Sequence, residues 1–503
     1  MLRKNILANY LGQFYNIIIG IVMVPFYLKY LGAEAYGLVG FFALMQSWMA
    51  LLDMGFSPTL SREVAKIKSS SNDVEKLQFK NLLHSLEFVF ILISILLSFG
   101  IIIFSDWIAQ NWLHVTILDM HSVAYCISLM GVIIGFRFIT TLYNSGILGA
   151  ESQVWLNGVN IILNTLRFVG VLAILHFIDN DIELFFEYQF LIGILTFFIF
   201  IFKFYWIVDI GQFKIYFSYK AIKPIMPFAM GIAYTGGIWV FLTQLDKLLL
   251  SNILSLQEYG YFAIVAMVAN AILQLSAPIG QALQPRMVSL LHQGKEAEML
   301  KLYRKATQFM AIFIFSVAGI VGAFSYELLY SWTGNAEASL WGKDILFWYV
   351  MGNAILAIGS FQYGLQFAHG KMKMHVEYNT IIVLISVPLI YFAAYNYGAL
   401  GVAMLWFGLR ALSFFVWIPI VHRKFAKGIH KDWMLQDVLP VFISSLAYLF
   451  LVKKLAISFD GSRLEIFMIL IVIGLGMLVV NSLVSNKWRM MIKNINERYK
   501  WII

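Results

Sequence analysis

Three arginines lie inside long apolar stretches of this 503-residue chain. Arg167 and Arg410 stand about 10 to 12 residues from the nearest polar segment, which at about 1.5 Å per helical residue is near the middle of a membrane. Arg137 lies about six residues from a polar segment, so its side chain can also reach the membrane surface. A charge at membrane depth costs roughly 2.5–3.5 kcal/mol on insertion. Each deep arginine therefore needs a compensating role.

Acidic side chains do not accompany these arginines along the sequence. The carboxylates that fall within apolar stretches lie near the ends of those stretches, among them Asp53, Glu87, Glu187, Asp246 and Glu327. The pattern predicts an interior with uncompensated positive charge, which suits a phosphate or diphosphate group. The alternative for Arg167 and Arg410 is hydrogen bonding to backbone carbonyls where a helix is broken.

Amide side chains follow one face of two predicted helices. Asn157, Asn160 and Asn164 precede Arg167 at helical spacing. Near the N-terminus, Asn9, Gln13 and Asn16 are also spaced so that they share one face of a helix. A third stripe comprises Gln362, Gln366, His369 and Lys373. Amides suit sugar hydroxyls, so we predict a hydrated cavity in which Arg137, Arg167 and Arg410 bind charge. Gln13, Asn16, Asn160 and Asn164 are the predicted sugar contacts. The alternative is amide bonding between packed helices.

Two of the carboxylates, Asp53 and Asp246, are candidates for gating or for coupling to an ion. The alternative is ordinary pairing at the membrane interface. Asp53 would then pair with a neighbouring cytoplasmic Arg or Lys, and Asp246 with Lys247 or Lys29.

The elements that position these residues are membrane-spanning helices. Hydrophobic residues make up 61% of the chain and charged residues 13%, whereas a soluble domain carries roughly 25% charged residues. Apolar stretches of about 20 residues, each long enough to cross a bilayer as a helix, recur along the whole chain. The predicted spans are 8–29, 36–57, 83–104, 121–143, 155–177, 184–206, 225–246, 258–281, 306–327, 345–367, 379–396, 399–421, 436–456 and 464–485.

Basic residues show which side of the membrane each loop occupies. Most of the 36 Lys and Arg fall in the N-terminus, the even-numbered loops and the C-terminus. The other side holds Lys29, Lys247, Lys343, Lys453, Lys454 and Arg463. The positive-inside rule then places both termini in the cytoplasm. The net charge of +9 therefore reflects topology and does not indicate a nucleic-acid partner.

A tandem duplication is visible in the spacing of landmarks. Tyr259-Gly260 repeats Tyr36-Gly37 at an offset of 223 positions, and Pro285 repeats Pro58 at an offset of 227. Six spans separate equivalent points, so the repeats are parallel. We predict an all-α polytopic membrane protein of about fourteen helices, with two six-helix repeats around a central cavity. The predicted divisions are 1–220, 221–430, and 431–503 with two further helices and a basic cytoplasmic tail. The deep charges are not copied, because Arg137 corresponds to Ile358 or Gly359 and Arg167 to Pro388 or its neighbour.

Several classes of chemistry are disfavoured. Cys126 is the only cysteine, so a cysteine metal cluster or an intrachain disulfide is excluded. The histidines are scattered, and nucleotide-binding and hydrolase motifs are missing. We therefore expect no metal, no cofactor and no enzymatic activity. The long basic loops 58–82 and 282–305 are each expected to contain a short amphipathic helix on the membrane surface.

The segment 25–37 (PFYLKYLGAEAYG), then 53–55 (DMG) and 61–65 (SREVA), resembles the start of the polysaccharide flippase family. That family exports O-antigen and related repeat units and belongs to the multidrug/oligosaccharidyl-lipid/polysaccharide exporter superfamily. Gly149 and the stretch from Asp246 to Gly260 resemble the same pattern. The two extra C-terminal spans are similar to those of lipid II flippases.

The resemblance implies a bacterial inner membrane and an undecaprenyl-diphosphate-linked oligosaccharide, moved by alternating access between two bundles. It also implies surface polysaccharide synthesis, with a polymerase and a chain-length regulator as further partners. Two other functions remain open. A drug or cation antiporter of the same superfamily would need a midplane carboxylate. A membrane-embedded polysaccharide-synthesis enzyme would be expected to carry a large outer loop or a catalytic histidine within a span.

Overall fold

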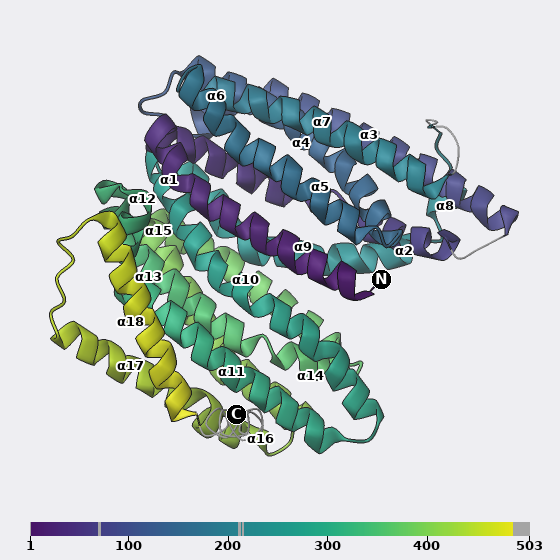
Figure 1. Cartoon of the computed structure of the whole chain (residues 1–503). Helices are drawn as coiled ribbons and strands as arrows, with labels where there is room; N and C mark the ends of the chain where they lie inside the picture. Colours follow the sequence, from purple (N-terminus) through teal and green to yellow (C-terminus); the bar gives the residue numbers. More distant parts are fainter. Residues whose placement is uncertain (1, 69–71, 210–212, 214–215, 486–503) are drawn as a thin grey trace, which may run out of the picture. The chain divides into compact units, whose positions relative to one another are not determined.

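The computed structural model describes residues 2–68, 72–209, 213 and 216–485. These residues form helices throughout, with one isolated β-bridge between His114 and Ser255 among them. The chain divides into two compact units, residues 1–260 and 261–503 (Figure 1). The repeat boundaries predicted near 220 and 430 stay predictions. The predicted basic tail, 487–500, lies outside the described residues.

Unit 1 contains the first nine helices, two π-helical turns and the start of a tenth helix. They are α1 (Leu2–Met49), α2 (Phe56–Lys68), α3 (Asp73–Trp107), η1 (Ile108–Trp112), α4 (Met120–Gly149), α5 (Gln153–Thr165), η2 (Leu166–Gly170), α6 (Val171–Phe177), α7 (Ile182–Val208), α8 (Tyr219–Ile222), α9 (Met226–Ile253) and α10 (Leu256–His292).

Unit 2 contains the rest of α10 and the helices that follow. They are α11 (Glu296–Ala323), α12 (Ser325–Thr333), α13 (Ala336–Gly359), α14 (Gln362–Ala368), α15 (Lys373–Phe425), α16 (Ile429–Asp432), η3 (Trp433–Val438), α17 (Leu439–Lys454) and α18 (Arg463–Val484).

Twelve helices in the described residues are long and apolar enough to cross a membrane, which confirms an all-α, multi-pass protein. Two of the twelve are bent at a glycine, Gly32 in α1 (φ 83°, ψ 174°) and Gly398 in α15 (φ 59°, ψ −151°). Glycine adopts such angles readily because it lacks a Cβ atom. Each bend separates two of the predicted spans, so the twelve helices are consistent with about fourteen crossings.

Two predicted boundaries need correction. The span predicted at 36–57 ends at Met49, because residues 50–55 form a turn before α2. The helix expected within 58–82 is confirmed as α2, which buries Phe56, Leu60 and Val64 on one face. The prediction of a separate helix within 282–305 was wrong. Helix α10 continues to His292 and buries Met287 and Leu290 at helical spacing.

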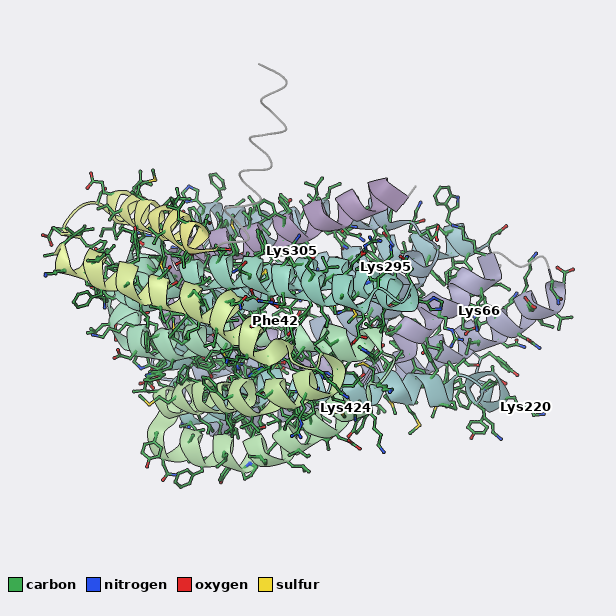
Figure 2. The ribbon with its side chains drawn as sticks, turned by 90° about the horizontal axis from the view of Figure 1, so that it is seen from below. Phe42, Lys66, Lys220, Lys295, Lys305 and Lys424 are labelled. Atoms are coloured by element: carbon green, nitrogen blue, oxygen red, sulfur yellow. The ribbon has the colours of Figure 1, made fainter. Side chains whose placement is uncertain are left out.

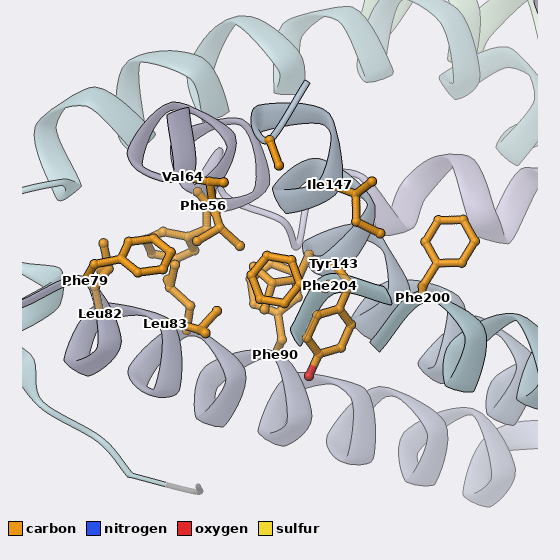
Figure 3. Packing of buried hydrophobic residues seen from close by; sticks show 14 of the residues in the cluster. Phe56, Val64, Phe79, Leu82, Leu83, Phe90, Tyr143, Ile147, Phe200 and Phe204 are labelled. Carbon is orange, nitrogen blue, oxygen red and sulfur yellow. The ribbon is translucent and has the colours of Figure 1, made fainter. Parts of the chain in front are cut away.

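The core of unit 1 lies between α2, α3, α4 and α7 (Figure 3). The Phe90 and Phe138 rings stack with their centroids 4.6 Å apart, and Tyr143 packs against Phe204 at 5.5 Å. Gly149 ends α4 where a Cβ atom would collide with the Ser61 carbonyl oxygen of α2. Lys66 and Lys220 lie at the same end of this unit (Figure 2).

The two C-terminal helices of unit 2 are attached to α11 and α12 by polar contacts. Arg304 of α11 forms an ion pair with the buried Asp437 of η3. Asn481 of α18 donates to Ser316 Oγ at 2.9 Å and to Ser445 Oγ at 2.8 Å. Such amide bonds hold membrane helices together where lipid provides no hydrophobic driving force.

Candidate substrate site

Arg167 lies in η2, a π-helical turn in the middle of the fifth predicted span. Such turns displace backbone carbonyls from the helical hydrogen-bond ladder and often occur at functional sites. Tyr188 Oη donates to the Leu166 carbonyl at 2.9 Å, and Gln189 Nε2 donates to the Arg167 carbonyl at 3.1 Å. Tyr27 Oη donates to the next carbonyl, that of Phe168, at 2.9 Å. Side chains from α1 and α7 therefore satisfy three consecutive carbonyls.

The Arg167 guanidinium is bonded to neutral groups. Its Nη1 donates to Asn164 Oδ1 at 3.2 Å, and its Nη2 lies 3.5 Å from Thr196 Oγ1. The Nε atom is buried and has no hydrogen-bond partner in the described part of the chain. The side chain is thus not used to repair the broken helix, which was the alternative explanation for this arginine.

Arg137 of α4 is held in a similar way. Its Nη1 donates to Gln46 Oε1, and its guanidinium lies 5.0 Å from the centre of the Phe42 ring. Its buried Nε also has no hydrogen-bond partner among the described residues. Among the described residues, neither Arg137 nor Arg167 forms an ion pair with a carboxylate.

The two amide stripes of unit 1 face each other. Asn157 Nδ2 donates to Asn9 Oδ1 at 2.6 Å, and Asn164 Nδ2 donates to Asn16 Oδ1 at 2.8 Å. This is the interhelical amide bonding given above as the alternative to sugar binding. Gln13 is exposed and Asn160 half-buried, and neither takes part in a hydrogen bond recorded for the described residues.

Arg410 belongs to unit 2, on the second half of α15. Its Nη1 donates to Asn353 Oδ1, and its guanidinium lies 5.0 Å from the centre of the Trp406 ring. Asn353 is itself fixed, because it is 1% exposed and its Nδ2 donates to the Ala269 carbonyl at 2.6 Å. Arg410 therefore has a defined orientation.

The third stripe lies at and just beyond α14. Gln366 Nε2 donates to Gln362 Oε1 at 2.6 Å, and the His369 ring lies 2.8 Å from the Leu365 carbonyl. Both glutamines are buried, whereas Lys373 is exposed. These contacts lie within the stripe itself and its own helix.

The two candidate gating carboxylates have local partners. Asp53 accepts from the backbone N–H of Ser57 at 3.2 Å and from the Ser57 hydroxyl, so it caps α2. Asp246 is 2% exposed, and its Oδ1 accepts from the Lys247 backbone N–H at 2.8 Å and lies 3.4 Å from Lys247 Nζ. A gating role for either carboxylate stays a prediction.

One buried cluster was missed by sequence reasoning. Glu87 is fully buried and is contacted by His84 of α3, Tyr143 of α4 and Tyr205 of α7. The spacing of His84 and Glu87 was the only local signal, because the two tyrosines come from distant spans. Within the described ranges, this cluster included, no group of three or more His, Cys, Asp or Glu is placed to hold a metal ion.

Residues 2–291 match the family model described as "Polysaccharide biosynthesis protein". The chain belongs to this family. It is also 23% identical over 403 residues to a Shigella flexneri protein named "Putative O-antigen transporter", a match that covers 80% of this chain and 93% of that protein. These matches confirm the resemblance drawn from the N-terminal motifs.

Solved structures show the same fold. A lipid II flippase MurJ in an inward closed conformation superimposes with a TM-score of 0.73 at 18% identity, covering 97% of this family member and all of that chain. A multidrug resistance MATE transporter of the MOP superfamily, in an inward-facing conformation, gives a TM-score of 0.63 at 12% identity. This match covers 82% of this chain and 96% of that transporter. The protein therefore shares the fold of these two solved structures.

Proposed function

We propose that this protein moves an undecaprenyl-diphosphate-linked oligosaccharide from the inner to the outer leaflet of the bacterial inner membrane. The movement would occur by alternating access and would serve synthesis of a surface polysaccharide such as O-antigen. Membership of the polysaccharide biosynthesis family and the similarity to an O-antigen transporter support this substrate class. Both termini would lie in the cytoplasm, and a polymerase and a chain-length regulator are further candidate partners.

The observation that carries the proposal is the pair of arginines in unit 1. Arg137 and Arg167 are both bonded to neutral oxygens, and each keeps a buried Nε–H without a partner among the described residues. A diphosphate would neutralise these positive charges and accept the remaining N–H groups, since guanidinium groups match phosphate geometry. A cationic drug would be repelled, because it carries the same sign of charge as the two arginines.

The remaining predicted residues fit supporting roles. Asn164 links Asn16 to Arg167, so this amide pair orients the guanidinium. Gln13 and Asn160 are the amides left to contact sugar hydroxyls. Arg410, held by Asn353 in unit 2, is a further predicted contact for negative charge. The prenyl chain would remain in the lipid while the polar head crosses.

The test combines a cellular and a binding assay. Arg167→Ala, Arg137→Ala and the matched Lys variants would be expressed in a strain that lacks the gene, with protein amount in the membrane measured. Arg62→Ala is the matched control, because Arg62 is an exposed arginine on α2. We expect the Ala variants to lose most surface polysaccharide and to bind undecaprenyl diphosphate at least about tenfold more weakly, a loss of about 1.4 kcal/mol.

The Lys variants should retain part of the binding but less than wild type, because lysine keeps the charge but not the bidentate geometry. Wild-type polysaccharide in both Ala variants at normal protein levels would contradict the site. Altered drug susceptibility with unchanged polysaccharide would support an antiporter instead. Polymerisation or modification of the lipid-linked unit by the purified protein alone would support an enzyme.

A further inference from the structure

A second buried polar cluster lies in unit 1, formed by Glu87, His84, Tyr143 and Tyr205. Glu87 is 0% exposed and His84 is 3% exposed. Glu87 Oε1 accepts from Tyr205 Oη at 2.7 Å and from Tyr143 Oη at 3.1 Å, while Oε2 lies 3.0 Å from His84 Nδ1. The cluster joins α3, α4 and α7 inside the aromatic core in which Tyr143 packs (Figure 3).

The ligand that fits this cluster is a proton and not a metal ion. Three donors already converge on the two carboxylate oxygens, whereas a bound cation would need oxygens with free lone pairs directed at it. In addition, the cluster falls in no group of three or more potential metal ligands among the described residues. The remaining question is where an added proton would reside.

Hydrogen-bond geometry answers that question. With one shared proton, neutral His84 carries hydrogen on Nδ1 and donates it to the Glu87 carboxylate. A second proton gives either an imidazolium beside the carboxylate, or a carboxylic acid that donates to Nδ1 while the imidazole hydrogen moves to Nε2. In both cases His84 Nε2 becomes an N–H group.

That N–H group has no acceptor in this conformation. His84 Nε2 is buried and finds no hydrogen-bond partner within the described part of the chain. Leaving a buried donor unpaired is costly, so the second proton is bound weakly here. A conformation in which α3, α4 and α7 rearrange to give Nε2 an acceptor would bind that proton more tightly. By linkage, proton uptake shifts the population toward that conformation.

The groups around the cluster leave the proton on Glu87 and His84. The titratable side chains that face the carboxylate are His84 from α3, Tyr143 from α4 and Tyr205 from α7. From α2, the packing face is apolar, with Phe56, Leu60 and Val64. From α8, the buried residue is Ile222. Ser218, just before α8, contributes a backbone N–H that Ser85 Oγ accepts at 3.0 Å.

We propose that Glu87 and His84 form a proton-binding switch whose second proton drives unit 1 out of the conformation seen here. In a transporter, such a switch would couple the conformational cycle to protons. That coupling role rests on the proposed function, whereas the switch itself is a property of the isolated protein.

The experiment uses the purified full-length protein in lipid nanodiscs. Infrared pH-difference spectroscopy reports carboxyl protonation, and hydrogen–deuterium exchange, corrected for the intrinsic effect of pH, reports the opening of α3, α4 and α7. The variants are Glu87→Gln, a neutral mimic of the protonated acid, and His84→Gln. Glu187→Gln is the matched control, because Glu187 of α7 also accepts from a tyrosine, Tyr125 Oη, at 3.0 Å but lies in an exposed contact.

We expect a carboxyl band to appear as the pH falls from about 8 to about 5, the range in which histidine and perturbed carboxyl groups titrate. The band should be lost in Glu87→Gln and kept in Glu187→Gln. Exchange in the three helices should rise on acidification in wild type, be raised at all pH values in Glu87→Gln, and lose its pH response in His84→Gln.

The proposal would be overturned if no carboxyl band of Glu87 appeared between about pH 8 and about pH 5. It would also be overturned if hydrogen–deuterium exchange in His84→Gln responded to pH as it does in wild type. If Glu87→Gln fails to fold, wild type, His84→Gln and Glu187→Gln still decide the question. A failure of the proposed transport function would leave these signals intact, because none of them depends on substrate.

Discussion

The motif 53–55 has a structural explanation at the level of single residues. Asp53 caps α2 through Ser57, while Met54 and Gly55 adopt positive φ angles of 48° and 72° that turn the chain into that helix. A Cβ atom at Gly55 would collide with the Ala229 carbonyl oxygen of α9. The motif therefore specifies a helix start and a close backbone approach.

Asp53 also gives a testable pH effect. Partial burial raises the pKa of its carboxyl group above the usual 3.8. The hydrogen bonds from Ser57 and Gly55 lower this pKa, but the effect of burial is larger. A pKa raised on folding contributes stability that is present below the unfolded pKa and is lost as the pH rises through the folded pKa. Asp53→Asn keeps an acceptor without the charge. Its thermal stability should therefore match wild type at acid pH and equal or exceed it at neutral pH.

Asp53→Ala separates the cap from the charge. It removes the acceptor for Ser57 and should lower stability by about 0.5–2 kcal/mol, the usual value of an N-cap. Thermal unfolding in detergent at several pH values measures both variants. An Asn variant that is less stable than wild type only at neutral pH would mean that the charge itself stabilises the fold.

The sequence predicted which arginines are buried, but it did not predict which side chains contact the buried polar groups. Arg137 and Arg167 were identified because a charge within an apolar stretch is conspicuous. Glu87 was read only as a residue near a span end, because Tyr143 and Tyr205 approach it from spans far along the chain. Asn9 and Asn157 were expected to face a cavity, and their mutual bond depends on the packing of two helices that the pattern alone does not align.

At the scale of helices, the apolar stretches predicted the long helices, because a run of about 20 apolar residues has the length and hydropathy of a membrane-spanning helix. The π-helical turn at 166–170 was not predictable, because its displaced carbonyls are stabilised by Tyr27, Tyr188 and Gln189 from other helices. The bends at Gly32 and Gly398 fall at polar breaks, although the helices continue directly on either side.

The π-helical turn can be tested with a matched pair of glycines in one span. A Cβ atom at Gly170 would collide with the Tyr188 hydroxyl, whereas one at Gly158 would meet open space. Gly170→Ala should displace Tyr188 from the Leu166 carbonyl, cost about 1–3 kcal/mol for the unpaired carbonyl, and reduce polysaccharide export by misplacing Arg167. Gly158→Ala should be neutral or slightly stabilising in thermal unfolding and normal in export. Equal export by the two variants would mean that the turn does not position the arginine.

At the scale of the whole molecule, the duplicated landmarks and the deep charges behave differently. Arg137 and Arg167 occupy unit 1 without copies at the equivalent positions of the second repeat, which are apolar, glycine or proline. The copied Tyr-Gly pairs instead meet each other. A Cβ atom at Gly37 would collide with the Leu256 carbonyl oxygen, and one at Gly260 with the Ala33 carbonyl oxygen. The glycines of the two predicted repeats thus lie at one close backbone contact, whereas Arg137 and Arg167 have no counterparts in the second predicted repeat.

This contact gives the last prediction, because both glycines open onto the same gap. A Cβ atom at Gly260 would also lie 3.1 Å from the Gly37 nitrogen. Gly37→Ala and Gly260→Ala should each lower stability by about 1–3 kcal/mol, since the colliding atoms are backbone and cannot rotate away. The first substitution widens the gap that the second needs, so the double variant should lose at least about 0.5 kcal/mol less than the sum. Gly20→Ala, in open space on α1, is the control and should not destabilise. Thermal unfolding of all four variants in one detergent measures the coupling, and strictly additive losses would show that the two copies do not share this contact.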